Sequence, residues 1–382
     1  MNFDLSEQHL ALKRMVRDFM EREVAPIAQE LDEKAEFPCE IVKKMGELGL
    51  MGLPFPERYG GGGADALSYV IMIEEITRVD SSLGITTEAN VTLGGFPLNR
   101  FGTEEQKQKW LKPLAQGKIL GAFGLTEPGA GSDAGATATT AVLKDNCWVI
   151  NGTKCFITNS GTDITGFVTV TTVTGRRKDG KKEISNIIIP KGAPGFNISK
   201  PYKKMGWRAS DTRELSFVDC RAPEENLLGE RGRGLRQFLE TLDEGRLGVA
   251  AMGVGLAQGC VEMSLKYAKE RVQFGQPIFQ FQAVQFKLVD MAVNVELARL
   301  MCYKAAVLKD EGKPYIKEAS MAKLFASETG MKAAIDGVQI YGGYGLMDDF
   351  PVSRFYRDAK FLTIGEGTSE IQRVVIARHL TS

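Results

Sequence analysis

Apolar residues recur at helical spacing through the first third of the chain. From Ser6 to Ala25 they fall on one helix face, and Pro26 follows as a stop signal. The stretch 54–63 holds too much Pro and Gly for a regular element and predicts a loop. The same helical spacing predicts three further helices, over 41–48, 66–78 and 103–114. Together these elements predict an N-terminal helical domain over residues 1–120.

From about residue 121 the period shortens to that of strands. Asn151-Gly152 interrupts the apolar run 147–158 and predicts a hairpin turn, because Asn-Gly favours positive φ. The charged segment 176–182 is expected to be a solvated hairpin tip, with a docking patch as the alternative. Further strands are predicted over 167–173, 183–189 and 214–218. These strands predict a middle β domain over 121–232.

Long helical periods return after residue 235, over 235–270, 283–311, 316–340 and 370–380. They predict a C-terminal four-helix bundle over 233–382. Helices and strands do not alternate, which excludes a Rossmann domain. The expected fold is therefore an α+β multidomain protein with an N-terminal helical domain, a central antiparallel β domain and a C-terminal four-helix bundle.

Charge and cysteine usage narrow the function classes. Lys plus Arg and Asp plus Glu number 48 each, so the net charge predicts no nucleic-acid partner and no membrane partner. The first residues carry no basic leader, and we expect no apolar run long enough to span a bilayer. The six cysteines are scattered without a C-x-x-C pair, which is typical of reduced cysteines in a cytoplasmic protein.

Histidine is scarce, which limits the possible chemistry. Only His9 and His379 occur, each near a terminus. A Ser-His triad or a histidine-based metal centre is therefore not expected, and the sequence predicts no metal site. If the protein is an enzyme, carboxylates or a cofactor must carry its chemistry.

One carboxylate stands in an unusual setting near the C-terminus. Glu366 lies between Gly365 and Gly367, just before an amphipathic helical run. Glycines allow a sharp bend and close approach of another molecule, so this carboxylate can project into a cleft as a base. The alternative is a simple turn with a solvated surface charge.

Three other stretches are candidates for binding. The glycine-rich loop 123–133 can bring N–H groups close to an anion or a ring edge, although an ordinary tight loop is the alternative. Arg246, in Asp243-Glu244-Gly245-Arg246 at an expected helix start, and Arg271 can each grip phosphate or carboxylate oxygens, or can form interhelical salt bridges. Glycines in the stretch 339–345 again invite close backbone contact.

Taken together and in this order, the four stretches resemble the acyl-CoA dehydrogenase family, in particular its short-chain (butyryl-type) or short branched or cyclic members. The likeness rests on Leu-Thr-Glu-Pro-Gly-Ala-Gly-Ser-Asp, Arg-x-Gln-Phe-Gly, Gln-x-x-Gly-Gly-x-Gly and Glu-Gly-Thr-Ser-Glu, and it runs from Phe3 to the end. The resemblance implies FAD. The residues implied to bind it are Phe123, Leu125, Thr126, Gly131, Ser132, Phe156, Ile157, Thr158, Arg271, Phe274, Gln282, Gln339, Gly342, Gly343, Thr368 and Glu370.

The resemblance also implies the reaction and the partners. Glu366 would remove the α-proton of an acyl-CoA thioester while a β-hydride passes to flavin N5, giving a trans-2-enoyl-CoA, as in fatty acid β-oxidation. Substrate contacts are implied for Ser132, Asp243, Arg246 and Gly367. The electron acceptor would be an electron-transfer flavoprotein. Arg271, Gln282 and the stretch 339–343 would reach the cofactor across a subunit interface, in a homotetramer that is a dimer of dimers.

The chain departs from the family pattern at several positions. Gly365 stands where many members have Tyr, which widens the pocket or is compensated by a neighbour such as Trp207. Glu88 is a polar contact, an alternative base or, as we expect, part of a helix-surface salt bridge. Gly245 occupies the place where isovaleryl-type members carry their base, so Glu366 is the single standard candidate. An acyl-CoA oxidase and a non-catalytic flavin-binding member are the alternative functions.

Overall fold

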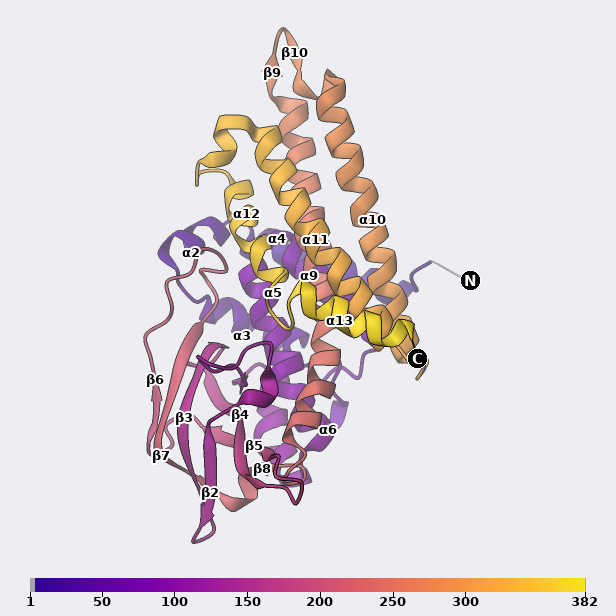
Figure 1. Ribbon diagram of the computed structural model, residues 1–382. Coiled ribbons are helices and arrows are strands. Elements are labelled where there is room, and N and C mark those ends of the chain that lie inside the picture. The colour runs from indigo at the N-terminus through magenta and orange to yellow at the C-terminus, as the bar shows by residue number, and fades with distance from the viewer. Residues whose placement is uncertain (1–3, 382) are drawn as a thin grey trace.

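The computed structural model describes residues 4–381. Residues 1–3 and residue 382 lie outside the described part. They include the outer ends of the first and last predicted domains, and Phe3, where the family resemblance begins. Within the described part, helices come first, a β-sheet follows, and long helices complete the chain (Figure 1). The expected fold class, with helices on either side of a central β block, is confirmed.

The N-terminal helices pack around α4. The predicted helix 6–25 is α1, which continues into a π-helical turn at Met20–Val24. The sequence pattern missed α5, because all its residues are buried and a helix buried all round shows no amphipathic period. The helices are α1 (Glu7–Phe19), α2 (Ala28–Lys34), α3 (Cys39–Glu47), α4 (Ala66–Val79), α5 (Ser81–Glu88), α6 (Phe96–Phe101), α7 (Glu104–Gln106) and α8 (Lys112–Ala115), with π-helical turns also at Ala89–Gly95 and Lys107–Leu111.

The central strands form one sheet in the order β6-β7-β3-β2-β4-β5-β8, with β1 beside β4. Most neighbours are antiparallel, as expected, but β1 runs parallel to β4, and so does the short contact of β2 with β4. The charged segment 176–182 does connect two antiparallel strands, β4 and β5. The strands are β1 (Leu120–Gly124), β2 (Thr140–Lys144), β3 (Cys147–Thr158), β4 (Thr165–Arg176), β5 (Lys182–Pro190), β6 (Phe196–Ile198), β7 (Thr212–Pro223) and β8 (Leu227–Leu228).

The predicted hairpin at Asn151-Gly152 is wrong. Strand β3 runs straight through it, and the pairing with β7 shifts register between Ile150 and Gly152. The turn lies earlier, at Asp145 and Asn146, which both have positive φ and join β2 to β3. Asn151-Gly152 thus forms a β-bulge and not a turn. A glycine with positive φ is compatible with both structures.

The C-terminal helices build a tower that ends in a small hairpin, β9 (Val272–Gln273) and β10 (Gln276–Pro277) (Figure 1). Four of them match the predicted ones, and the sequence pattern missed α12. The helices are α9 (Gly234–Glu270), α10 (Gln282–Asp310), α11 (Ile316–Tyr341), α12 (Pro351–Leu362) and α13 (Ser369–Leu380). The sequence analysis predicted no segment apolar and long enough to span a bilayer, but α9 is such a segment. This helix passes that test by length and composition, but 78% of its most apolar stretch is buried inside the protein, as in the core helix of a globular domain.

Helix α9 is the central support of the molecule, because α4, α10 and α11 all pack on it. Close approach depends on glycines: a Cβ at Gly255 would lie 2.2 Å from the Glu74 carbonyl oxygen of α4. Asp243 and Arg246 lie well inside α9, which begins at Gly234, and not at a helix start as the sequence predicted. The α9 stretch 243–248 therefore lies in the interior of the protein, and the candidate active site described below lies beside it.

Candidate active site

Glu366 lies in the short loop between α12 and α13, in a left-handed backbone conformation with a φ of 52°. Non-glycine residues rarely adopt this conformation, and it costs free energy unless the surroundings hold it. Lys323 of α11 donates a 2.7 Å hydrogen bond to the Gly367 carbonyl oxygen, and Thr368 caps α13 by accepting from the Ile371 N–H. The loop is thus held from both sides.

The Glu366 carboxyl group points into the protein. Both its oxygens are buried, and no amide, ammonium, guanidinium or alcohol group of the described residues donates to either of them. The space comes from Gly245 of α9, where a Cβ would lie 1.7 Å from Glu366 Oε2. Burial raises the pKa of Glu366, while the Glu88 carboxyl, Lys323 and Arg246 oppose that rise. The solvated surface charge considered for Glu366 is therefore excluded.

Glu88, at the end of α5, is fully buried, so its expected place in a helix-surface salt bridge is wrong. Its carboxyl group lies beside that of Glu366: the two groups lie over Gly248 and Gly245, one helical turn apart on the same face of α9, and each affects the ionisation of the other. Burial, and then the negative charge of Glu366, raise the pKa of Glu88 well above its ordinary value. Two carboxyl groups from distant parts of the chain therefore share one chamber.

Asp243 and Arg246 form an ion pair within α9, with Arg246 Nη1 2.5 Å from Asp243 Oδ1. Arg246 is 5% exposed, and its Nε atom has no partner among the described residues. Burial lowers the pKa of Arg246 and raises that of Asp243. The interhelical salt bridge considered for Arg246 is therefore wrong: its partner is on the same helix, and one donor remains available.

The glycine-rich loop after β1 is held by a buried ion pair that the sequence reading missed. Lys154 of β3, with no exposed surface, donates to Glu127 Oε1 at 2.6 Å and to the Leu125 carbonyl oxygen at 3.0 Å. Glu127 also accepts from Thr137 and from backbone N–H groups. Burial opposes its ionisation, yet the hydrogen bond from Lys154 and the other donors lower its pKa to about 2. Glu127 is part of the loop motif Leu-Thr-Glu-Pro-Gly-Ala-Gly-Ser-Asp, and this was the one feature of the sequence that could have pointed to its structural role.

The residues of this region that were expected around a flavin differ in their exposure to solvent. Phe123 is buried at the end of β1, Leu125 and Thr126 are half-buried, and Gly131 and Ser132 are exposed. Phe156 has a φ of 61°, is 67% exposed, and packs its ring on Tyr202. Ile157 points the other way, into the core of the sheet, and Thr158 is half-buried. Phe156 and the loop therefore offer surface for a ligand, whereas Ile157 does not.

A second group of predicted residues lies at the far tip of the tower. Arg271 stacks on Tyr344, and Phe274 is 93% exposed. At 1.5 Å per residue, Gln339 lies roughly 24 Å along α11 from Lys323, which contacts the Glu366 loop. The group comprises Arg271, Phe274, Gln282, Gln339, Gly342 and Gly343. The tip and the Glu366 loop thus lie far apart within one chain.

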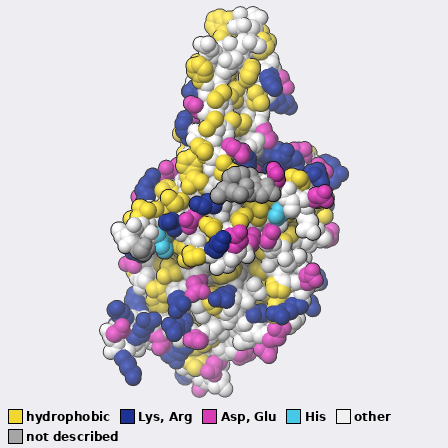
Figure 2. Space-filling model, turned by 90° about the vertical axis from the view of Figure 1, so that its right-hand side faces the viewer, with side chains coloured by type: hydrophobic (Ala, Val, Ile, Leu, Met, Phe, Trp, Pro, Cys, Tyr) yellow, Lys and Arg dark blue, Asp and Glu magenta, His cyan; other side chains and the backbone are white. Residues whose placement is uncertain are grey.

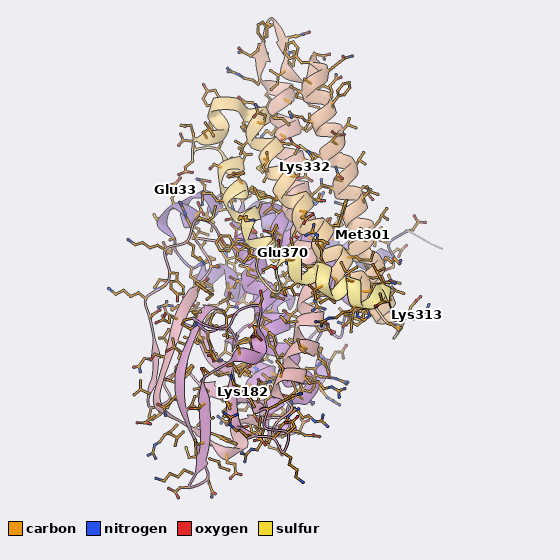
Figure 3. The ribbon with its side chains drawn as sticks, viewed as in Figure 1. Glu33, Lys182, Met301, Lys313, Lys332 and Glu370 are labelled. Carbon is orange, nitrogen blue, oxygen red and sulfur yellow. The ribbon has the colours of Figure 1, made fainter. Side chains whose placement is uncertain are left out.

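A surface groove of about 420 Å³ adjoins the Glu366 loop. Its lining includes Lys332 of α11 and, from the loop and the start of α13, Thr368, Ser369 and Glu370. Figure 3 labels Glu370 at the start of α13 and Lys332 on α11. The hydroxyl oxygen of Ser369 is buried without a partner among the described residues. The groove thus offers both cationic and hydroxyl groups to a ligand.

Three large apolar side chains of the helical part, Met252, Trp207 and Phe279, are mostly part of the core. Met252 has no exposed surface. Trp207 is buried, donates from Nε1 to Ser81 at 2.8 Å, and packs on Phe361 of α12. Phe279 packs at the edge of the helical core. In residues 4–381, no three or more His, Cys, Asp or Glu side chains gather in a way that could hold a metal ion.

Comparison with known proteins matches all three parts of the chain to one family. The N-terminal domain of acyl-CoA dehydrogenase matches residues 6–118, the middle domain 122–220 and the C-terminal domain 232–381. A probable acyl-CoA dehydrogenase, YngJ, of Bacillus subtilis is 54% identical over 380 residues, which is 100% of each chain.

Solved structures agree. The butyryl-CoA dehydrogenase of Megasphaera elsdenii is 42% identical, with a TM-score of 0.96 and 100% of both chains covered. An acyl-CoA dehydrogenase of Bacillus anthracis in complex with FAD is 36% identical, with a TM-score of 0.92, covering 99% of this chain and 68% of that one. Sequence, fold and the buried carboxylate loop lead to one conclusion: the chain belongs to the acyl-CoA dehydrogenase family.

Proposed function

We propose that this protein binds FAD and dehydrogenates short-chain or compact branched acyl-CoA thioesters to trans-2-enoyl-CoA, with Glu366 as the base. The observation that carries the proposal is the buried Glu366 carboxyl group, to which no amide, ammonium, guanidinium or alcohol group of the described residues donates. Its left-handed backbone conformation is held by the Lys323 hydrogen bond to the Gly367 carbonyl oxygen, by a second one from Gln372, and by the Thr368 cap. A group kept in such a costly arrangement is a strong candidate for a functional role.

The residues present fit FAD. Gly129 and Gly131 have no neighbour within 4 Å of their Cβ positions, and neither have Gly342 and Gly343 at the tower tip, so a ligand can approach the backbone at both places. The exposed ring of Phe156 and the unpartnered hydroxyl of Ser369 are further contacts. Thr126 and Phe156 would hold the ring system, Thr368 and Ser369 the ribityl-phosphate region, and Arg271, Gln282 and 339–343 the adenine end of a neighbouring subunit's cofactor. When bound, FAD supplies the acceptor for the β-hydride.

The chain's own residues account for the other half of the reaction. Glu366 takes the α-proton onto its carboxylate, and burial, which raises its pKa, makes it a better base. The Glu366 backbone N–H would donate to the thioester carbonyl oxygen, where negative charge develops. Ser132, Asp243 and Arg246 would contact the CoA portion, and Gly367 its thioester end. The test is an anaerobic visible spectrum of the flavin-loaded protein: butyryl-CoA should bleach the flavin, and an unbleached flavin would exclude this substrate.

Gly245→Ala should inactivate the protein without unfolding it. The new Cβ would lie 1.7 Å from Glu366 Oε2, so the base must leave its place. A displacement on this scale costs roughly 10²-fold in the rate of flavin reduction. Stopped-flow reduction by butyryl-CoA measures that rate. Gly365→Ala is the matched control in the same site, since its Cβ would meet only the Phe361 carbonyl oxygen at 3.5 Å. Equal rates for the two variants would contradict the role given to Gly245.

We also propose the homotetramer, a dimer of dimers. Figure 2 shows apolar side chains gathered along the tower, and α10 carries many of them at the surface: Phe286, Val289, Val293, Leu297 and Leu300. Contiguous exposed apolar residues of this kind mark interaction surfaces. Val293→Arg together with Leu297→Arg should therefore reduce the assembly's mass, as light scattering measures, whereas Lys304→Ala on the same helix should not. A monomeric unaltered protein would contradict the proposal.

We propose the electron acceptor, the cellular setting and the pathway on the same grounds. The electron acceptor would be an electron-transfer flavoprotein, the setting the cytoplasm, and the pathway fatty acid β-oxidation. The three-domain division at 1–120, 121–232 and 233–382 also stays a prediction.

A further inference from the structure

Beneath the Glu366 loop, α9 presents bare backbone where two side chains are missing. Gly245 and Gly248 lie one helical turn apart and therefore on the same face. A Cβ at Gly245 would meet Glu366 Oε2, and a Cβ at Gly248 would lie 2.6 Å from Glu88 Cγ and 2.7 Å from the Tyr69 hydroxyl oxygen. These absent side chains leave the space that two carboxyl groups and a phenol occupy together.

The neighbours of Glu88 leave one of its oxygens without a donor. Thr92 Oγ1, one helical turn further along the chain, is 2.5 Å from Glu88 Oε1 and 3.0 Å from the Glu88 carbonyl oxygen. The Thr92 hydroxyl carries a single proton between these two acceptors, so Oε1 has a hydrogen-bond partner in Thr92. Glu88 Oε2 is buried and has no donor among the described residues. Since an ionised carboxyl group can only accept, Oε2 is satisfied only if it carries a proton itself.

The charges around the pair favour one proton rather than none. The groups that face Glu366 are Glu88 of α5, Arg246 of α9 and Lys323 of α11, with the Tyr69 phenol of α4 beside Glu88. Arg246 is already paired with Asp243, and Lys323 donates to the Gly367 carbonyl oxygen. Two ionised carboxylates in contact would repel each other in a site from which water is excluded.

We propose that Glu88 is a positioning residue for Glu366: it carries a proton on Oε2, donates it in a hydrogen bond to the Glu366 carboxylate, and holds that carboxylate over Gly245 in the substrate-free protein. The meaning of this pair for catalysis rests on the proposed function. A neutral donor beside the base stabilises its ionised form, so Glu366 stays ionised, and able to accept a proton, although it is buried.

The first test is the pH dependence of flavin reduction by butyryl-CoA. In Glu88→Met the donor is lost and the side chain keeps a similar length, so Glu366 should need a higher pH to ionise. The acid limb of the rate profile should then move up by about one pH unit. Glu88→Gln keeps an N–H donor and should leave the acid limb where it is. Equal shifts in both variants, or a shift in neither, would overturn the proposal, because a purely structural role does not distinguish Gln from Met.

The second test needs no turnover. The infrared spectrum of the substrate-free protein at neutral pH should contain a protonated-carboxyl C=O band that disappears in Glu88→Gln. Asp358 is the internal control, since burial raises the pKa of this other buried carboxyl to about 7, and Asp358→Asn should remove a different band. If Glu88→Gln removes only an ionised-carboxylate band, the proposal fails. Because this readout uses no substrate, it separates failure of the Glu88 proposal from failure of the proposed dehydrogenase reaction.

Discussion

Glu366→Gln should bind FAD as the unaltered protein does and yet leave the flavin unbleached by butyryl-CoA. The amide is isosteric with the carboxyl group and fits the space over Gly245, but it cannot take up the α-proton. A positioned general base contributes roughly 10²–10⁴-fold to a rate, and we expect a loss at the upper end because the neighbouring carboxyl group, Glu88, is proposed to be protonated. The measurements are the flavin content after purification and the single-turnover rate of flavin reduction under anaerobic conditions.

The control for this experiment is Glu88→Gln, which alters the neighbouring buried carboxyl group. If Glu366 is the base, Glu88→Gln keeps most of the rate, because the amide still donates to Glu366. If instead Glu366→Gln keeps its turnover and Glu88→Gln loses it, the base is Glu88. Loss of FAD in Glu366→Gln would show that the loop is needed for cofactor binding, and the base assignment would then rest on the pH profile.

Lys154→Met should destabilise the protein by about 3–5 kcal/mol, the cost of leaving a buried charge without its partner. Lys154 has no exposed surface, Glu127 is 7% exposed, and their 2.6 Å ion pair also fixes the Leu125 carbonyl oxygen. Since that carbonyl belongs to the loop proposed to hold the flavin, we expect weaker FAD binding as well. Urea unfolding at pH 7 measures the free energy, and flavin titration measures the affinity.

Two comparisons make the Lys154 experiment specific. Arg236→Met breaks an ion pair with Glu240 in which the Arg236 side chain is 74% exposed, and it should change stability by less than about 1 kcal/mol. Glu127 has a pKa of about 2 in the folded protein against 4.5 ordinarily, so its contribution is complete above pH 4.5 and is lost as the pH falls toward 2. Glu127→Gln should therefore flatten the fall in stability across that range. An equally steep fall would show that Glu127 is not responsible for it.

The recognisable motifs predicted the family and most long elements, because these depend on local pattern. The four predicted C-terminal helices were found within a few residues, since their apolar residues recur at helical spacing that is visible in the sequence. Predictions from the local sequence pattern failed where contacts with distant parts of the chain determine the secondary structure. Helix α5 is buried on every side and shows no period, and Asn151-Gly152 forms a bulge in a continuous strand because β7 pairs across it.

The candidate active site likewise has features that the sequence predicted and features that only the tertiary structure decided. The glycines around Glu366 made this carboxylate a candidate, because a glycine-flanked acid before a helix is a local feature, and the resemblance of the whole chain to the family then singled it out as the candidate base. Its partners could not be read from sequence. Glu88 meets Glu366, and Lys154 meets Glu127, only when α5, α9 and β3 pack, and burial then changes what each charge can do. The sequence pattern determined the family of the protein, while long-range packing, which removes water from these groups, determined their position and shifted their pKa values.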